Sequence, residues 1–190
     1  MGFTHPTVAL SSAHVIQLPH RSPSNVRRCV SASVQVLSWQ QAYAGLIPDQ
    51  YLDALQSSLS RRAAFWCEAI AEGRTHLSLA CVNEQVIGFI AIGACRDEGA
   101  SAGETGEVTA FYLLPRYWRT GAGRALWAAG LRSLVEHRYR QAMLWALSEN
   151  TRARRFYDQA GWSPEPASER SLLIGGASLL EIRYRSPALS

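Results

Sequence analysis

The chain has 190 residues, 47% of them hydrophobic, and a formal charge of +4, which is compatible with one globular domain. All 19 of its basic residues are arginines. The absence of lysine excludes a Walker-type phosphate loop, a pyridoxal phosphate or aldolase Schiff base, and the Ser-x-x-Lys acyl enzymes.

The first half of the chain is expected to be mainly helical and then to form two strands. Residues 1–12 show no periodicity and are expected to be a disordered tail, and residues 13–187 a single domain without repeats or a linker. The sequence shows a short apolar run, and the apolar spacing after it predicts three helices and a hairpin. These elements cover residues 15–18 for the run, 26–44, 48–55 and 61–71 for the helices, and 77–82 and 86–95 for the strands.

Strands and helices are expected to alternate in the second half. Residues 97–106 are rich in Gly, Ala, Ser and Glu, which predicts an exposed loop. The following alternation predicts an α/β layer with at least one parallel strand pair. The expected elements are a strand at 108–114, a helix from 121, a strand at 143–147, a helix at 151–160, and a hairpin of 172–174 with 179–184.

The cysteines and the apolar segments exclude several classes. Cys29, Cys67, Cys81 and Cys95 have no Cys-x-x-Cys spacing and no paired histidines nearby, so we expect buried free thiols and no metal site. The longest apolar stretch, residues 86–95, is far below the ~20 residues of a membrane span. Without a signal-peptide pattern, these features predict a cytoplasmic protein with no membrane partner.

The arginines are concentrated in one part of the chain. Residues 116–155 hold nine arginines against two glutamates, whereas the other ten arginines are outnumbered by thirteen acids. This distribution predicts a polyanionic partner at one site. Solvated helix faces and a nucleic-acid-binding patch are the alternatives.

The segment 115–126 has the pattern of an anion-binding turn. A strand end runs through Gly121-Ala122-Gly123 into a helix, so backbone amides and the positive end of the helix dipole would face a ligand. Arg119 and Arg124 flank the turn and could pair with phosphate oxygens. A tight strand-to-helix turn without a ligand is the alternative. A dinucleotide fingerprint would need a third glycine at Leu126 and is excluded.

Three segments in order, 106–115, 121–123 and 150–162, resemble the GCN5-related N-acetyltransferase (GNAT) superfamily, bacterial type. Residues 38–48 are also similar to one common bacterial branch, so the resemblance extends from about residue 15 to 185. It implies an α/β (α+β) fold with a mixed sheet of six or seven strands, splayed between the fourth and fifth, and about four helices. Acetyl-CoA, the cosubstrate of the superfamily, would lie in the gap.

The resemblance also implies the cofactor-binding residues by position. Main-chain groups of β-strand residues would contact the pantetheine arm, the glycine turn the pyrophosphate, Asn150 the cofactor arm, and Arg155 or a neighbour the outer phosphates. The full set is Phe111, Tyr112, Leu113, Arg119, Thr120, Gly121, Ala122, Gly123, Arg124, Asn150 and Arg155. Trp118 stands where many members carry Gln or Arg, but backbone amides make most of these contacts, so the expectation holds.

Two catalytic residues are expected from the same resemblance. An alkyl ammonium is less than ~0.1% free base at pH 7, so the amine must lose a proton, and Glu107 stands where several members hold a glutamate that acts through a water. Tyr157 stands at the position of the tyrosine that protonates the thiolate. Their alternatives are an exposed strand-end carboxylate for Glu107 and core packing beside Phe156 for Tyr157.

The predicted function is acetyl-CoA-dependent N-acetylation of a primary amine by direct attack in a ternary complex. A small-molecule acceptor is favoured over a protein, because Trp145 stands where ribosomal-protein N-terminal acetyltransferases carry a catalytic glutamate. A non-catalytic acyl-CoA-binding sensor and a protein or peptide N-acetyltransferase are the alternatives.

The acceptor is expected to lie among residues 39–55, residues 97–106 and the final hairpin. Trp39, Tyr43 and Tyr51 would either line an aromatic pocket for the amine or pack in the core. Dimers are frequent in proteins that this chain resembles, so a homodimer is a further expectation.

Overall fold

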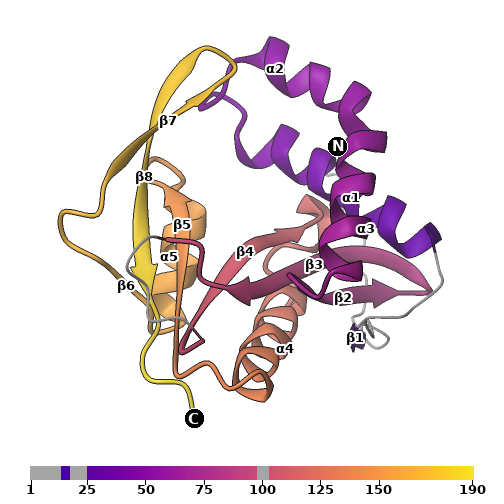
Figure 1. Ribbon diagram of the computed structural model, residues 1–190. Coiled ribbons are helices and arrows are strands. Elements are labelled where there is room, and N and C mark those ends of the chain that lie inside the picture. The colour runs from indigo at the N-terminus through magenta and orange to yellow at the C-terminus, as the bar shows by residue number, and fades with distance from the viewer. Residues whose placement is uncertain (1–13, 18–24, 98–102) are drawn as a thin grey trace, which may run out of the picture.

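The computed structural model describes residues 14–17, 25–97 and 103–190, with backbone alone for residues 25–31. Its centre is a mixed eight-stranded sheet in the order β1-β2-β3-β4-β5-β8-β6, with β7 paired to β8 (Figure 1). The strands are β1 His14–Gln17, β2 His76–Val82, β3 Gln85–Ala94, β4 Thr105–Leu113, β5 Gln141–Leu147, β6 Ser163–Pro164, β7 Arg170–Ile174 and β8 Ala177–Arg185.

Five α-helices and two 3-10 turns complete the described fold. They are α1 Asn25–Ala42, α2 Asp49–Ala54, η1 Leu55–Ser58, α3 Leu59–Ala71, η2 Pro115–Tyr117, α4 Ala122–Glu136 and α5 Thr151–Gln159. No helix in the described ranges has the length and apolar content needed to cross a membrane.

The expected helices and strands are all present, with shifted ends and one addition. Thr105 and Gly106, expected in a loop, begin β4 because they pair with Gln141 and Ala142 of β5 and are buried. The two-residue strand β6 was not expected, since so short a segment carries no periodicity. The expected tail of residues 1–12 lies outside the described residues. Residues 98–102 of the loop expected at 97–106 lie outside them as well.

The expectation of buried thiols is only partly correct. Of the three cysteines whose side chains are described, Cys81 is buried, whereas Cys67 and Cys95 are half-buried. None of the three forms a disulfide.

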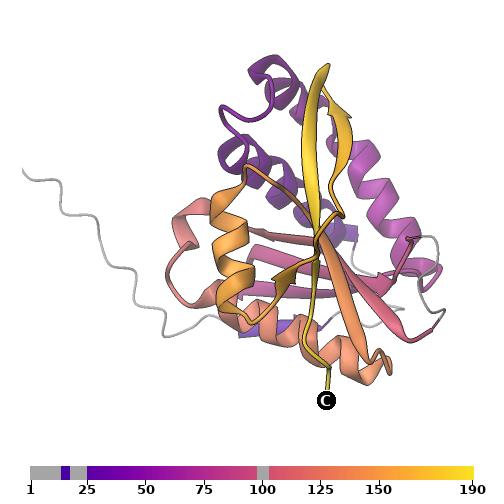
Figure 2. The ribbon, with the colours of Figure 1, turned by 90° about the vertical axis from the view of Figure 1, so that its left-hand side faces the viewer.

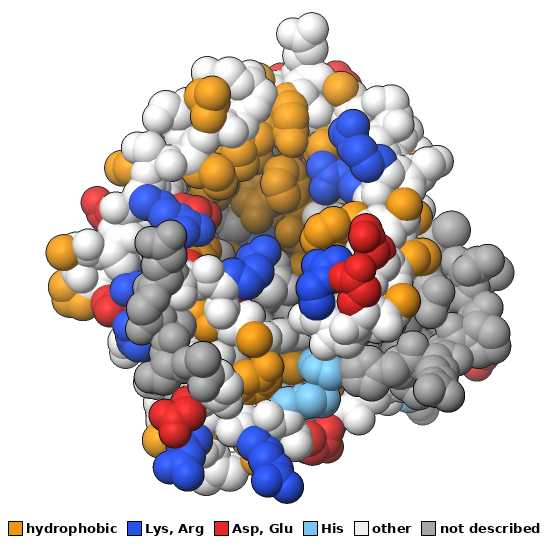
Figure 3. Space-filling view, viewed as in Figure 1, with side chains coloured by type: hydrophobic (Ala, Val, Ile, Leu, Met, Phe, Trp, Pro, Cys, Tyr) orange, Lys and Arg blue, Asp and Glu red, His pale blue; other side chains and the backbone are white. Residues whose placement is uncertain are grey.

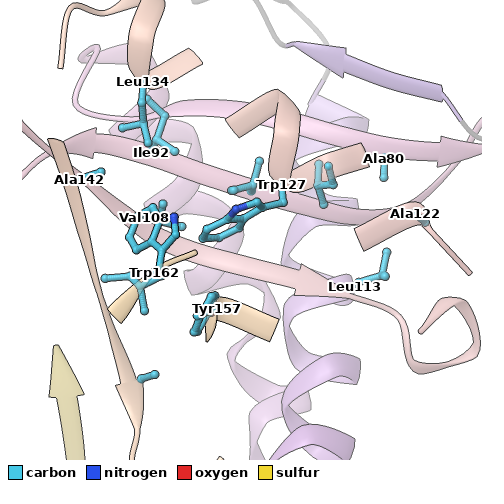
Figure 4. Close-up of a cluster of buried hydrophobic side chains, with 14 of the residues drawn as sticks. Ala80, Ile92, Val108, Leu113, Ala122, Trp127, Leu134, Ala142, Tyr157 and Trp162 are labelled. Atoms are coloured by element: carbon cyan, nitrogen blue, oxygen red, sulfur yellow. The ribbon is translucent and has the colours of Figure 1, made fainter. Parts of the chain in front are cut away.

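Helices cover both faces of the sheet. Helices α4 and α5 lie together on one face (Figure 2), where the indole of Trp127 packs 5.2 Å from the ring of Trp162 and 5.4 Å from that of Tyr157 (Figure 4). Helices α1 and α3 cover the other face through a second cluster that includes Trp66 and Phe89. The sheet is therefore the middle layer of three.

Strands β4 and β5 run side by side for a short distance and then diverge. Their parallel pairing covers only Thr105↔Gln141 to Glu107↔Met143, although β4 continues to Leu113 and β5 to Leu147 (Figure 1). Beyond this point the edge of β4 has no β5 partner. The carboxyl ends of both strands thus flank an opening in the sheet, as expected.

A β-bulge in β4 sets the direction of Glu107. Ile92 pairs with Val108 and Ala91 with Ala110, so Thr109 is an extra residue on β4. Side chains alternate along a strand, and an extra residue breaks the alternation. Val108 lies in the core on the α4 side, whereas Tyr112 packs on the α1 and α3 side. Glu107, next to Val108, therefore projects to the same face as Tyr112.

Candidate active site

Residues 119–124, the turn expected to bind phosphate and called the phosphate turn below, join η2 to the start of α4. Gly121, at the N-cap of α4, has a φ of 92°, a left-handed conformation that glycine adopts at little cost, and Arg119 has a φ of 63°. The Thr120 hydroxyl donates a 2.6 Å hydrogen bond to the carbonyl of Tyr117 and fixes the turn.

The start of α4 can accommodate an anion. No side chain caps this helix end and no acidic residue lies in its first turn, so its first amides are available to a ligand. A Cβ atom at Gly123 would meet its nearest neighbours at 3.6 to 4.0 Å, which is ordinary contact. The packing of the chain therefore does not require glycine at position 123. A phosphate group that approaches the backbone there would require it, and the turn fits such a group.

The sequence cluster of arginines does not form one patch. Arg119 and Arg124 lie at the phosphate turn, whereas Arg138 and Arg140 follow the other end of α4. That helix has 15 residues and is about 22 Å long at 1.5 Å per residue. The local excess of charge thus divides between two ends of a helix.

Three arginines of α5 differ in their environments. Arg154 points inward, where Nη1 donates to the carbonyl of Ser148 (2.9 Å) and Nε to the hydroxyl of Tyr184 (3.2 Å). Arg155 is exposed. The guanidinium carbon of Arg152 lies 3.7 Å from the ring centroid of Trp118, beside the phosphate turn. The sequence did not indicate this contact, because it joins segments that only the tertiary fold brings together.

The open edge of β4 carries Phe111, Tyr112 and Leu113, the expected pantetheine contacts. None of the three is paired with β5. The carbonyl of Leu113 already accepts a 2.9 Å hydrogen bond from Nε1 of Trp118, which leaves one of its two lone pairs free. This edge can still bind an extended ligand through its remaining main-chain groups.

Three tyrosines from different elements lie close to one another. Burial raises the pKa of Tyr157, and the nearby phenols of Tyr112 and Tyr184 add to the effect. Burial also raises the pKa of Tyr43, just after α1, with further contributions from Tyr112 and Tyr157. The phenols of Tyr43, Tyr112 and Tyr157 are therefore close enough to interact electrostatically. The sequence predicted a role for the Tyr157 phenol but not for that of Tyr112.

Asn150 is the N-cap of α5. Its Oδ1 accepts a 3.2 Å hydrogen bond from the amide of Ala153, and its side chain lowers the pKa of Tyr43 against the larger effect of burial. Asn150 thus fixes the start of α5 at the carboxyl end of β5 and also contacts the tyrosine cluster.

Glu107 is not the exposed strand-end carboxylate of the alternative reading. It is only 3% exposed, and Arg96, just after β3, donates to Oε2 through its amide (3.2 Å) and Nε (3.0 Å) and to Oε1 through Nη2 (2.6 Å). The hydrogen bond with Glu107 raises the pKa of Arg96. A buried carboxylate is thus compensated by a paired cation. The sequence gave no indication of Arg96.

Trp145 of β5 links the end of the 97–106 segment to the final hairpin. Nε1 of Trp145 lies 3.2 Å from both carboxylate oxygens of Asp97, and the guanidinium carbon of Arg170 lies 3.6 Å from the indole centroid. Asp97 also forms ion pairs with Arg170 (3.6 Å) and Arg183 (3.0 Å). Position 145, where a catalytic glutamate would be needed for the mechanism of ribosomal-protein N-terminal acetyltransferases, therefore carries an indole held by Asp97 and Arg170.

Two of the expected acceptor elements, residues 39–55 and the final hairpin, border one hollow, whereas residues 98–102 of the third lie outside the described residues. Figure 3 shows a concave surface lined largely by hydrophobic side chains, between the α1–α3 helices and the β7–β8 hairpin. Trp39 and Tyr43 pack edge to face at 4.9 Å between ring centroids. A Cβ atom at Gly175 would lie 2.7 Å from the Cβ of Tyr51, so the tip of the hairpin touches α2. Trp39, Tyr43 and Tyr51 also pack against a third core cluster, as the core-packing alternative predicts, and their role in an amine pocket stays a prediction.

Comparison with protein families agrees with this geometry. The model of the acetyltransferase (GNAT) family matches residues 37–162. The uncharacterized N-acetyltransferase YuaI of Bacillus subtilis is 32% identical over 167 residues, which cover 84% of this chain and 87% of that protein.

Solved structures share the fold at low sequence identity. The PaiA N-acetyltransferase of Thermoplasma acidophilum, solved in complex with coenzyme A, has a TM-score of 0.70 at 17% identity, covering 92% of this chain and 98% of its own. The putative acetyltransferase yncA of Salmonella typhimurium, solved with acetyl-CoA, has a TM-score of 0.65 at 15% identity, covering 94% and 95%. Both likenesses extend over more than nine-tenths of this chain.

Proposed function

Because the chain belongs to the acetyltransferase (GNAT) family and is an acyltransferase, we propose that it transfers the acetyl group of acetyl-CoA to a primary amine of a small molecule. One observation carries the proposal: Glu107 and Tyr112 lie on β4, which borders the opening and leads to the uncapped start of α4, and the phenols of Tyr43 and Tyr157 are close enough to that of Tyr112 to interact electrostatically. These are the parts that acyl transfer from a long phosphorylated thioester needs.

Acetyl-CoA is the proposed cosubstrate, bound along the open edge of β4. The coenzyme A and acetyl-CoA bound in the two structural neighbours support its role as cosubstrate. The proposed phosphate contacts are residues 119–124, and the proposed pantetheine contacts are Phe111, Tyr112, Leu113 and Asn150. Bound acetyl-CoA supplies the acyl group as a thioester, which an amine attacks directly without an acyl-enzyme.

Glu107 is the proposed proton acceptor, acting through a water. The amine must lose a proton to attack the carbonyl carbon, and the carboxylate of Glu107, held in place by hydrogen bonds from Arg96, can accept it through an intervening water. Burial strengthens its electrostatic effect on an approaching ammonium group. The bulge at Thr109 supports this role, since it directs Glu107 to the face of the acceptor hollow.

Tyr157 is the proposed proton donor to the departing thiolate. Burial raises its pKa, so the phenol stays protonated throughout the physiological range. When the carbon–sulfur bond breaks, the sulfur takes the electron pair and the phenol can supply the proton. The amides on the open edge of β4 could at the same time stabilise negative charge on the carbonyl oxygen.

A small amine is the proposed acceptor because one side of the hollow is closed. The tip of the β7–β8 hairpin touches α2 through Gly175 and Tyr51, so an extended peptide has no open path between these elements. The hydrophobic lining of the hollow suits the carbon skeleton of a small amine (Figure 3).

The test combines cofactor binding with turnover. We expect acetyl-CoA to raise the melting temperature, since ligand at 100 times its dissociation constant adds about 2.7 kcal/mol of stability. Thiol release should then identify acceptors among small amines and amino-terminal peptides. No stabilisation at millimolar acetyl-CoA would contradict the proposal. Stabilisation without turnover on any acceptor would favour a sensor, and faster turnover on peptides would favour a peptide acetyltransferase.

A further inference from the structure

A cation–π contact spans the mouth of the opening between β4 and β5. Trp118 follows β4 through η2, and Arg152 lies in the first turn of α5, which follows β5. The guanidinium carbon of Arg152 lies 3.7 Å from the centroid of the indole ring, and Nε1 of that indole is tied to the carbonyl of Leu113. Figure 2 shows the loop after β4 beside α5. The two walls of the opening are therefore in contact at the phosphate turn.

The donors of Arg152 remain free for a ligand. Stacking occupies one face of the guanidinium and leaves its N–H groups in the plane, where they can bind phosphate in forked geometry. Among the described residues, no carboxylate is within ion-pair distance of Arg152. Neither the first turn of α5 nor that of α4 holds an acid. An oriented cation without an anion thus lies beside the phosphate turn.

The indole of Trp118 cannot itself donate to a ligand, since its only donor is bonded to the carbonyl of Leu113. The ring instead holds Arg152 from the opposite wall. The positively charged group beside the turn is therefore supplied from α5.

We propose that Arg152 binds a phosphate group of the coenzyme A moiety and that Trp118 positions its guanidinium for this contact. The inference rests on the proposed binding of acetyl-CoA in the opening. Arg152 replaces Arg155 as the arginine of α5 that meets the cofactor phosphates, because Arg154 is tied to Ser148 and Tyr184 and Arg155 is exposed without a contact to the turn.

The test measures cofactor affinity by calorimetry, independently of turnover. Wild type, Arg152→Gln, Arg155→Gln and Arg132→Gln would be titrated with coenzyme A and with its 3′-dephospho form. Arg132, exposed in the second half of α4, is the charge-matched control. Arg152→Gln should weaken coenzyme A binding about tenfold, as expected for loss of a charge-assisted contact, and Arg132→Gln less than twofold. All these side chains are exposed, so the variants should fold.

The dephospho form identifies the phosphate. A loss confined to coenzyme A would place Arg152 on the 3′-phosphate, and an equal loss with both ligands would place it on the diphosphate; both support the inference. Affinities within twofold of wild type for both ligands would overturn it. So would an equal loss in Arg132→Gln, which reports only long-range charge, or a larger loss in Arg155→Gln.

A double-variant cycle tests the role of Trp118. In a Trp118→Leu background, Arg152→Gln should cost less than threefold, because the guanidinium is no longer positioned. The same tenfold cost in both backgrounds would overturn the positioning role. Failure of the wild type to bind coenzyme A would contradict the proposed function itself, so the two failures are distinguishable.

Discussion

Arg96 covers the buried carboxylate of Glu107 and donates to both of its oxygens. The side chain of Glu107 is 4% exposed, whereas that of Arg96 is 70% exposed. Glu107 lies on β4, where it pairs with Gly93 of β3, and Arg96 follows the end of β3. The ion pair offsets the cost of burying the carboxylate in a largely apolar sheet. The carboxylate lies on the face of the sheet that carries the acceptor hollow.

Glu107→Gln should lower kcat at pH 7 by about 10²-fold, because the variant cannot accept the proton of the amine. The deficit should shrink as pH rises, since the free-base fraction of an alkyl amine grows tenfold per pH unit below its pKa. Cofactor affinity should not change. The measurement is the pH–rate profile of both proteins between pH 6 and 10 at saturating acetyl-CoA.

Glu84→Gln is the matched control, because Glu84 is an exposed carboxylate in the turn between β2 and β3, outside the expected acceptor segments. It should retain wild-type turnover. Parallel profiles for wild type and Glu107→Gln, differing by a constant factor at every pH, would show that Glu107 acts by position or stability and not as a proton acceptor.

Tyr157→Phe should reduce turnover by about 10²-fold while the KM for acetyl-CoA stays within threefold, because the phenol acts on the leaving group. Burial raises the pKa of Tyr157, so deprotonation of this phenol should cause no loss of wild-type rate between pH 9 and 10. Steady-state kinetics across this range test both points.

Tyr184→Phe is the control for Tyr157→Phe. Tyr184 is also buried, and its ring centroid lies 5.6 Å from that of Tyr157. Its hydroxyl accepts from Arg154, so the variant should lose about 1 kcal/mol of stability but little turnover. Equal kinetic losses in both variants would assign Tyr157 to packing.

The position of the turn before α4 could be predicted from its own residues. Gly121 requires a left-handed conformation, and the helix after it begins within one residue of the expected position. The alternation of apolar segments likewise predicted the order of strands and helices, because each element is defined by its own periodicity.

The partners of the site residues were not predictable in this way. The Arg96–Glu107 pair depends on strand register and on the extra residue Thr109, and the Trp118–Arg152 contact depends on how far β4 and β5 diverge. Each is a tertiary relation between segments whose sequences carry no common pattern. The sequence could not choose between Arg155 and its neighbours as the contact of the outer phosphates for the same reason.

Gly121→Ala should lower the stability of the fold, whereas Gly123→Ala should lower the affinity for acetyl-CoA. At Gly121, φ is 92°, so alanine should cost about 1–2 kcal/mol and lower the melting temperature. At Gly123, inside the first turn of α4, alanine meets only ordinary contacts and should not destabilise. It should nevertheless weaken acetyl-CoA binding at least tenfold, because its methyl group occupies the approach to the amides. Unchanged affinity in Gly123→Ala would remove this turn from the binding site.

Glu165 makes stability depend on acid pH. It accepts hydrogen bonds from Arg185 (2.8 Å) and from Arg183, and these bonds lower its pKa from 4.5 to about 2. Since the folded-state pKa lies below the ordinary value, folding favours the ionised form. The stabilisation is complete above about pH 4.5 and disappears as pH falls through 2.

Glu165→Gln should therefore lower the free energy of unfolding at pH 7 by about 1–2 kcal/mol, a figure reduced for solvent screening because the side chain is 25% exposed. The difference from wild type should narrow below pH 4.5 and vanish near pH 2. Urea unfolding at several pH values measures it, with the exposed neighbour Glu169→Gln as the control. A deficit that is the same at pH 7 and pH 2.5 would mean that Glu165 stabilises the β8 strand by packing and not through its charge.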